Sequence, residues 1–216
     1  MIPTTTPTTP TPTPTPPPYF LLSVDIGIKN FAWAVFEIHS SPTTIVKFVT
    51  GGVRELVGNY KKGRVRDFDV VCALTKWASE VLVPKFKTSP DDQLVIEQQV
   101  QTAKLNRILS FVLGSMWYPN KVTFVPSNRK FTGMPAHFFP SNVTQETVTD
   151  GSYKERKQAS VDLAQNINRV FLKSQTIDEI FDSLDKKDDF ADAICQAVYL
   201  CTTEEKKRRK KKRRLE

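Results

Sequence analysis

The sequence predicts an α/β fold in which a five-stranded mixed sheet, three antiparallel strands followed by two parallel ones, is flanked by helices. Two observations support this class. The chain first carries consecutive apolar runs separated by short polar turns, which is typical of antiparallel strands. It then alternates helical and strand-like segments, an order that favours parallel neighbours. The length of 216 residues fits one domain with tails.

The first three strands form a predicted meander. Apolar and aromatic residues fill 19–24 and 31–38, and the polar connection between them contains Gly27, which favours a hairpin turn. A third strand is expected over 45–49, and the glycine pair at 51–52 should end it.

Helical periodicity begins after this meander. Apolar residues three and four positions apart predict a helix over 65–83, which Pro84 should end. Short strands are expected at 93–97 and 122–125, and between them residues 102–118 form the most regular amphipathic helix. The apolar stripe of this helix either faces the core or pairs with a second copy of the chain across a two-fold axis. The partner prediction is therefore a homodimer through 102–118.

The C-terminal half is less regular. Residues 127–152 have no clear period, and a loop of this length in a compact domain is usually functional or mobile. Its aromatic residues, which lie beside Arg129 and Lys130, would stack on nucleic-acid bases or pack on the body of the domain. Further helices are expected over 153–173, 177–184 and 186–201.

Both ends of the chain differ in composition from the body. Residues 1–18 are almost all threonine and proline, which predicts a disordered, extended arm. Residues 206–214 are all lysine or arginine and, together with Glu216, account for the net charge of +8, because the rest of the chain is balanced. A disordered basic tail over 204–216 should attract nucleic acid or act as an import signal, with a purely solubilising tail as the alternative. The folded domain is then 19–203.

Acidic residues stand at the ends of two predicted strands and at the start of the last helix. Asp25 follows the first strand and Glu97 ends the fourth, where a buried carboxylate is costly without a cation. Asp189 and Asp192 are three positions apart and share a helical face. Because parallel strands end at the same edge of a sheet, these four carboxylates are expected to converge there. The alternative for Asp25 is an ordinary turn residue.

Clustered carboxylates repel one another, so such a group requires cations. Ligands that are all oxygen favour Mg²⁺, with Mn²⁺ as a substitute, over zinc. Two such ions about 3.5–4 Å apart would clamp the attacking and leaving oxygens of a phosphodiester displacement. The pattern therefore predicts metal-dependent chemistry on a nucleic acid, the polyanion that attracts the basic tail. No apolar run reaches the roughly 18 residues of a membrane span, so no membrane partner is expected.

At these residues the chain resembles the RuvC-like Holliday junction resolvases, in particular their fungal mitochondrial and poxvirus–iridovirus branches. Three stretches carry the resemblance: 23–32 (SVDIGIKNFA), 95–99 (VIEQQ) and 186–193 (KKDDFADA). The resemblance implies a ribonuclease H-like fold, a homodimer, and Mg²⁺-dependent symmetrical nicking of four-way DNA junctions that leaves 5′-phosphate and 3′-hydroxyl ends.

The resemblance also implies roles for single residues. Two metal ions per active site would be held by the catalytic acids Asp25, Glu97, Asp189 and Asp192, with Asp188 as a close alternative to Asp189. Lys157, at a basic helix start, would contact the scissile phosphate. The side chains expected to contact DNA are Lys29, Gln98, Lys104, Arg107, Arg129, Lys130, Lys154 and Arg156.

Other functions stay open on the sequence. A different ribonuclease H-like nuclease would cut RNA–DNA hybrids or flaps, and a non-catalytic junction binder would rely on the basic tail. A kinase-like ATPase also places Asp-x-Gly at a strand turn, but it needs a late Gly-rich loop, and this chain has no glycine after Gly151. The Thr/Pro arm lacks arginine and is a poor mitochondrial transit peptide, which favours the nucleus or a viral replication site.

Overall fold

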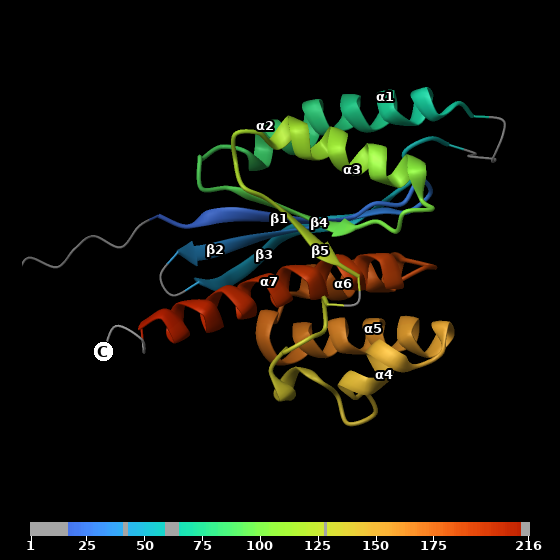
Figure 1. The fold of residues 1–216 in the computed structure, drawn as a ribbon. Coiled ribbons are helices and arrows are strands. Elements are labelled where there is room, and N and C mark those ends of the chain that lie inside the picture. Colours follow the sequence, from blue (N-terminus) through green and yellow to red (C-terminus); the bar gives the residue numbers. More distant parts are fainter. Residues whose placement is uncertain (1–16, 41–42, 59–64, 128, 213–216) are drawn as a thin grey trace, which may run out of the picture.

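In the computed structural model of the chain, a central five-stranded sheet separates two layers of helices (Figure 1). The structure describes residues 17–40, 43–58, 65–127 and 129–212. The strands are β1 (Tyr19–Asp25), β2 (Phe31–Ser40), β3 (Thr43–Arg54), β4 (Gln93–Gln98) and β5 (Val122–Pro126). They lie in the order β3-β2-β1-β4-β5; β2 pairs antiparallel with β1 and β3, and β4 pairs parallel with β1 and β5. The predicted mixed sheet is confirmed.

Helices cover both faces of this sheet. Their bounds are α1 (Asp67–Trp77), α2 (Val83–Phe86), α3 (Lys104–Trp117), α4 (Gln145–Asp150), α5 (Tyr153–Ile167), α6 (Gln175–Ser183) and α7 (Asp188–Lys212). The helices α1, α2 and α3 lie on one face and α6 and α7 on the other, with α4 and α5 outside α7 (Figure 1). Across the described residues, no helix combines the length and apolar character needed to cross a bilayer.

The alternation of side chains along the strands divides the core into two parts. In β1, Leu22 and Val24 belong to the cluster that includes the buried residues of α1 and α3, whereas Leu21 belongs to the cluster under α7. In β4, Ile96 joins the first cluster and Val95 the second. Because side chains alternate with a period of two, the residues that end these strands are directed toward α7.

The glycine pair expected to end the third strand lies inside β3, which continues to Arg54. Gly51 pairs with Ala34 of β2, and a Cβ atom there would lie 2.6 Å from the carbonyl oxygen of Trp33 and 2.9 Å from the ring of Phe190. The glycine is therefore required by close packing between strand and helix, and it does not mark a turn.

Pro84 does not end the first helix, contrary to the prediction. The chain passes from α1 through a π-helical turn, Ala78–Leu82, directly into α2. Pro84 occupies the first turn of α2, directly after the π-helical turn, and this turn accommodates a residue that has no backbone N–H.

The segment expected to be an irregular loop contains short helices. Residues Ala136–Phe138 form a 3₁₀ turn, and α4 begins at the capping residue Thr144, whose side chain accepts a hydrogen bond from the N–H of Thr147. Phe131 and Phe138 are buried in the core under α7, so these rings pack on the domain body and are not free to stack on bases.

The last helix is longer than expected. α7 continues to Lys212, whereas the sequence predicted a disordered basic tail from residue 204. Lysine, arginine and glutamate are good helix formers, and Glu204 forms an ion pair with Lys121, so the packed part of α7 extends outward as a helix. Residues 1–16 of the predicted arm and 213–216 of the tail lie outside the described residues.

We predict that Gly51→Ala lowers the free energy of unfolding by about 1–3 kcal/mol, because the added methyl group meets backbone and two aromatic rings. Urea unfolding followed by circular dichroism measures the change. Gly58→Ala is the matched control, since a Cβ atom at Gly58 meets nothing within 4 Å. Equal stability of the two variants would contradict the packing role of Gly51.

Candidate active site

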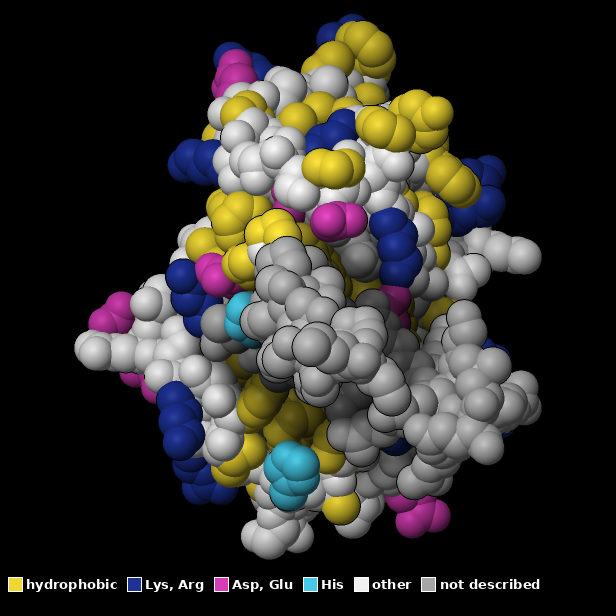
Figure 2. Space-filling model, turned by 90° about the vertical axis from the view of Figure 1, so that its left-hand side faces the viewer, with side chains coloured by type: hydrophobic (Ala, Val, Ile, Leu, Met, Phe, Trp, Pro, Cys, Tyr) yellow, Lys and Arg dark blue, Asp and Glu magenta, His cyan; other side chains and the backbone are white. Residues whose placement is uncertain are grey.

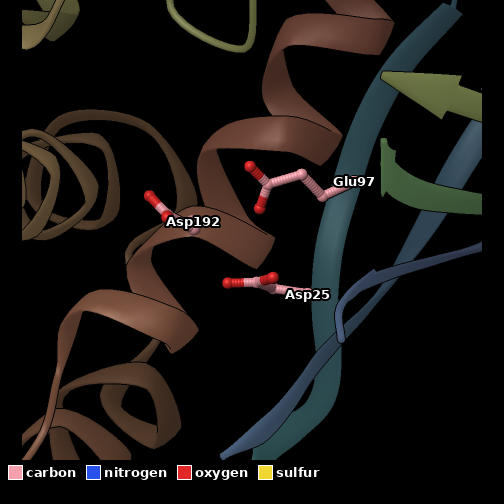
Figure 3. Close-up of side chains that lie close together, drawn as sticks. All are labelled: Asp25, Glu97 and Asp192. Atoms are coloured by element: carbon pink, nitrogen blue, oxygen red, sulfur yellow. The ribbon is translucent and has the colours of Figure 1, made fainter. Parts of the chain in front are cut away.

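Three carboxylates from distant parts of the chain meet at one edge of the sheet. Asp25 ends β1, Glu97 lies near the end of β4, and Asp192 lies in the first turns of α7. One oxygen from each lies within 4.8 Å of the other two, and the side chains of Asp25 and Glu97 extend from the sheet toward α7, which carries Asp192 (Figure 3). We call these three residues the carboxylate triad.

The fold places the triad through strand alternation and register. β1 and β4 are parallel neighbours in which Val24 is level with Ile96, so the next residues, Asp25 and Glu97, lie side by side. Both continue the set of side chains that faces α7. The parallel pairing thus brings Asp25 and Glu97 together, and the packing of α7 against the sheet adds Asp192.

Two polar residues hold Asp192 in position. Ser160 of α5 donates a hydrogen bond to Asp192 Oδ1 at 2.5 Å. One turn further along α7, the buried Gln196 donates to Ser23 Oγ at 3.1 Å and to the carbonyl oxygen of Val24 at 3.2 Å, which fixes α7 against β1. Sequence reasoning missed both residues. Gln196 could have been found from the sequence, because it is an amide four positions after Asp192 in an otherwise apolar run. No feature of the sequence indicated Ser160.

Lys130 lies inside the triad and not on the surface where a DNA contact was expected. Its Nζ is 2.5 Å from Asp192 Oδ2 and 3.5 Å from Glu97 Oε1, and its side chain is only 6% exposed. Burial alone would lower the pKa of Lys130, but Asp192, Glu97 and Asp25 outweigh burial and raise it. The residue is therefore an ammonium ion held among carboxylates.

The environment also raises the pKa of two acids of the triad. Burial raises the pKa of Asp25 well above its usual 3.8, and the nearby charges of Glu97 and Asp192 add to this, while Lys130 opposes it. Burial likewise raises the pKa of Glu97, with Lys130 opposing and Asp192 adding to the effect. The acids are thus close enough to disfavour the charged forms of Asp25 and Glu97, as a cation site requires.

The other two candidate acids lie beside the triad. Asp189 lines a cavity of about 420 Å³ together with Asp25, and its carboxylate forms an ion pair with Lys186. Asp188 forms ion pairs with Lys157 and, at 3.5 Å, with Lys186. Burial raises the pKa of Asp189, whereas the two lysines outweigh burial and lower that of Asp188.

Basic and amide side chains lie on both sides of the triad. Lys157 and Arg156 line a cavity of about 220 Å³ together with Asp192 and Lys130, and Lys157 also lies over the ring of Tyr153 at 4.9 Å. On the other side, Lys29 lines the cavity that contains Asp25, and Gln98 and Arg107 line a cavity between α3 and β5. The remaining candidates are also exposed, and these are Lys104, Arg129 and Lys154.

The sequence profile described as Poxvirus A22 protein matches residues 19–203, most of the chain. The chain belongs to this family. A relative of this A22 family member is the Holliday junction resolvase of Fowlpox virus (strain NVSL). The two are 25% identical over 173 residues, which cover 80% of this chain and 86% of the relative.

Solved structures of resolvases share the fold of this A22 family member. The fowlpox virus Holliday junction resolvase matches with a TM-score of 0.54 and 21% identity, over 85% of this chain and 98% of that one. The yeast mitochondrial Holliday junction resolvase matches with a TM-score of 0.58 and 14% identity, over 94% of this chain and 87% of that one. RuvC of Thermus thermophilus matches with a TM-score of 0.54 and 9% identity, over 87% of this chain and 96% of that one. The predicted RuvC-like, ribonuclease H-like fold is confirmed.

We predict that Asp25→Asn stabilises the metal-free protein. Because the pKa of Asp25 is higher in the folded than in the unfolded chain, the folded state loses stability as pH rises from the unfolded value through the folded one. The variant escapes this loss, so its melting temperature in EDTA at neutral pH should be higher by about 2–4 °C. The difference should shrink below about pH 4.

Differential scanning fluorimetry across pH measures this effect. The control is Asp182→Asn, which removes an exposed carboxylate from α6. A variant that melts below the wild-type protein at neutral pH would show that the charge of Asp25 is stabilising in the metal-free state.

Proposed function

We propose that this A22 family member is a Holliday junction resolvase, an endonuclease that nicks four-way DNA junctions symmetrically. The single observation that carries the proposal is the convergence of Asp25, Glu97 and Asp192 at the sheet edge of a ribonuclease H-like fold. The similarity to the fowlpox virus resolvase supports the choice of substrate.

The donor set of the triad fits a hard divalent cation. It offers carboxylate oxygens from three elements within 4.8 Å of one another, and these favour Mg²⁺, with Mn²⁺ as a substitute. We propose that two ions act at each site, with Asp189 or Asp188 completing the ligands. When bound, they would supply an activated water and neutralise charge on the phosphodiester.

The residues of the chain then have separate roles. The triad holds the cations, and Ser160 and Gln196 keep Asp192 and α7 in place. Lys157 borders the cavity next to Asp192 and would contact the scissile phosphate. The exposed cations on both sides would contact the phosphates of the junction arms, as sequence-independent positioning requires.

We predict that the purified protein nicks a labelled four-way junction in Mg²⁺ and not in EDTA. Glu97→Gln should reduce the cleavage rate by at least about 100-fold while the protein still binds the junction, because a direct ligand should matter at least as much as its supporting residues. Gel assays of cleavage and mobility measure both, and Asp182→Asn is the control. Full activity of Glu97→Gln would contradict the proposed site.

The same assay separates the rival functions. A nuclease directed at RNA–DNA hybrids would cut a hybrid duplex faster than the junction, and a flap nuclease would prefer a flap substrate. A non-catalytic binder would shift the junction in the gel and leave it uncut in Mg²⁺ and in Mn²⁺.

We further propose that the protein acts as a homodimer through α3. This helix buries Leu109 and Leu113 against the sheet, so its apolar stripe does face the core. It also presents a second apolar face outward: Phe111 is 63% exposed and packs against Phe124 of β5, and Tyr118, at the end of the helix, is 78% exposed. Figure 2 shows hydrophobic side chains gathered over the upper helix layer.

A second copy is the occupant that suits this outward face. A two-fold axis would bring the two α3 faces together and place two triads in one assembly. A four-way junction also has two equivalent strands to cut, so a symmetric dimer matches the symmetry of its substrate.

We predict that Phe111→Glu converts the dimer into a folded monomer, because two like charges would face each other across the axis. Light scattering after size-exclusion chromatography measures the mass, and circular dichroism checks folding. Phe68→Glu is the matched control, since Phe68 is 70% exposed on α1, outside the α3 face. An unchanged dimer in Phe111→Glu would place the interface elsewhere.

A further inference from the structure

Lys130 is the only buried basic residue in the part of the chain that the structure describes. Its side chain is 6% exposed, and its Nζ forms ion pairs with two of the three triad carboxylates, at 2.5 Å and 3.5 Å. A lysine with this little exposure cannot serve as an ordinary surface contact for DNA. Both ion pairs of its charge are with triad carboxylates.

Charge balance limits what else the triad can hold. Three carboxylates carry three negative charges when ionised, and the ammonium of Lys130 cancels one of them. A divalent cation approaching the same oxygens therefore meets less negative charge than the acids alone would offer. It also has to share or replace the ion pair that Asp192 Oδ2 already makes with Lys130.

We propose that Lys130 is an internal counter-ion that competes with divalent cations for the carboxylates of Asp192 and Glu97. It holds the three acids together when the protein carries no metal, and it withdraws from these oxygens when metal binds. This inference rests on the metal-dependent function proposed above and adds a residue that sets the metal affinity of the same site.

The surroundings give the side chain room to withdraw. Lys130 also lines the cavity of about 220 Å³ that is bordered by Tyr153, Arg156 and Lys157, and its Nζ lies 5.5 Å from the centre of the Phe131 ring. The side chain of lysine has a flexible stem of four carbons, so the ammonium can leave the triad while the backbone stays in place.

Lys130→Met tests the proposal, because methionine keeps most of the length of the stem and removes the charge. In EDTA, the variant should melt about 10 °C below the wild-type protein, since three clustered, partly buried acids lose their counter-ion. Its dissociation constant for Mn²⁺ and for Mg²⁺ should fall by about tenfold or more, because the competing cation is gone. Calorimetric titration with each metal and thermal melting measure the two effects, and neither depends on nuclease activity.

Two further variants make the outcome decisive. Lys121→Met removes a lysine from an exposed ion pair with Glu204 and should change neither quantity. Lys130→Met combined with Asp192→Asn removes both charges of the closest pair, and should regain stability in EDTA while binding metal weakly. If Lys130→Met does not fold in EDTA, addition of Mn²⁺ should restore the fold.

Unchanged or weaker metal binding by Lys130→Met would overturn the proposal, as would unchanged stability in EDTA or a failure of Mn²⁺ to rescue an unfolded variant. These results leave the proposed nuclease function standing if the wild-type protein binds metal and cuts junctions. Absence of metal binding by the wild-type protein would instead contradict the metal-dependent function and, with it, the competition.

Discussion

The arrangement of the site depends on holding three negatively charged side chains close together. Three carboxylates lie with ligand oxygens within 4.8 Å of one another, an arrangement that repulsion and burial both oppose. The fold meets this constraint with rigid elements, because two parallel strands and one helix fix the three backbones. It meets it also with positive charge, since Lys130 lies among the acids and Lys186 and Lys157 pair with the two acids beside them. The edge of the sheet therefore carries a matching positive charge for its clustered acids.

A fully buried acid elsewhere in the sheet shows how a structural carboxylate differs from these. Asp92 precedes β4, at the opposite end of the strand from Glu97, and is 1% exposed. Its two oxygens accept hydrogen bonds from the backbone N–H groups of Phe20, Thr88 and Ser89, at 2.6–2.7 Å. Backbone donors satisfy its charge, so it has no need of a cation. The triad carboxylates have each other and a lysine instead, which is the arrangement that the proposed cation site requires.

Sequence periodicity predicted most of what places the site. The alternating apolar runs and the acids at their ends were enough to bring Asp25 and Glu97 to one edge, because strand register follows from side-chain alternation. Asp192 was predicted there from its place at the start of the last helix. The burial of Lys130 could not be predicted, since it lies after β5 in a segment without a period whose conformation is set by tertiary packing. The predicted ends of the third strand at Gly51 and of the first helix at Pro84 were wrong for a related reason. Each is usually a local stop signal, but a close strand–helix approach requires the first and a π-helical turn accommodates the second.

The choice among the acids of the last helix shows where sequence spacing reaches its limit. Asp188 and Asp189 stand four and three positions before Asp192, so both lie near its helical face and spacing alone cannot separate them. The neighbours of α7 do so, because this helix packs between the sheet and α5. Asp188 is directed toward α5 and pairs with Lys157, whereas Asp189 lines the cavity that contains Asp25. Of the two, Asp189 is therefore the acid that lies beside Asp25, and Asp188 is the acid that holds Lys157 in place.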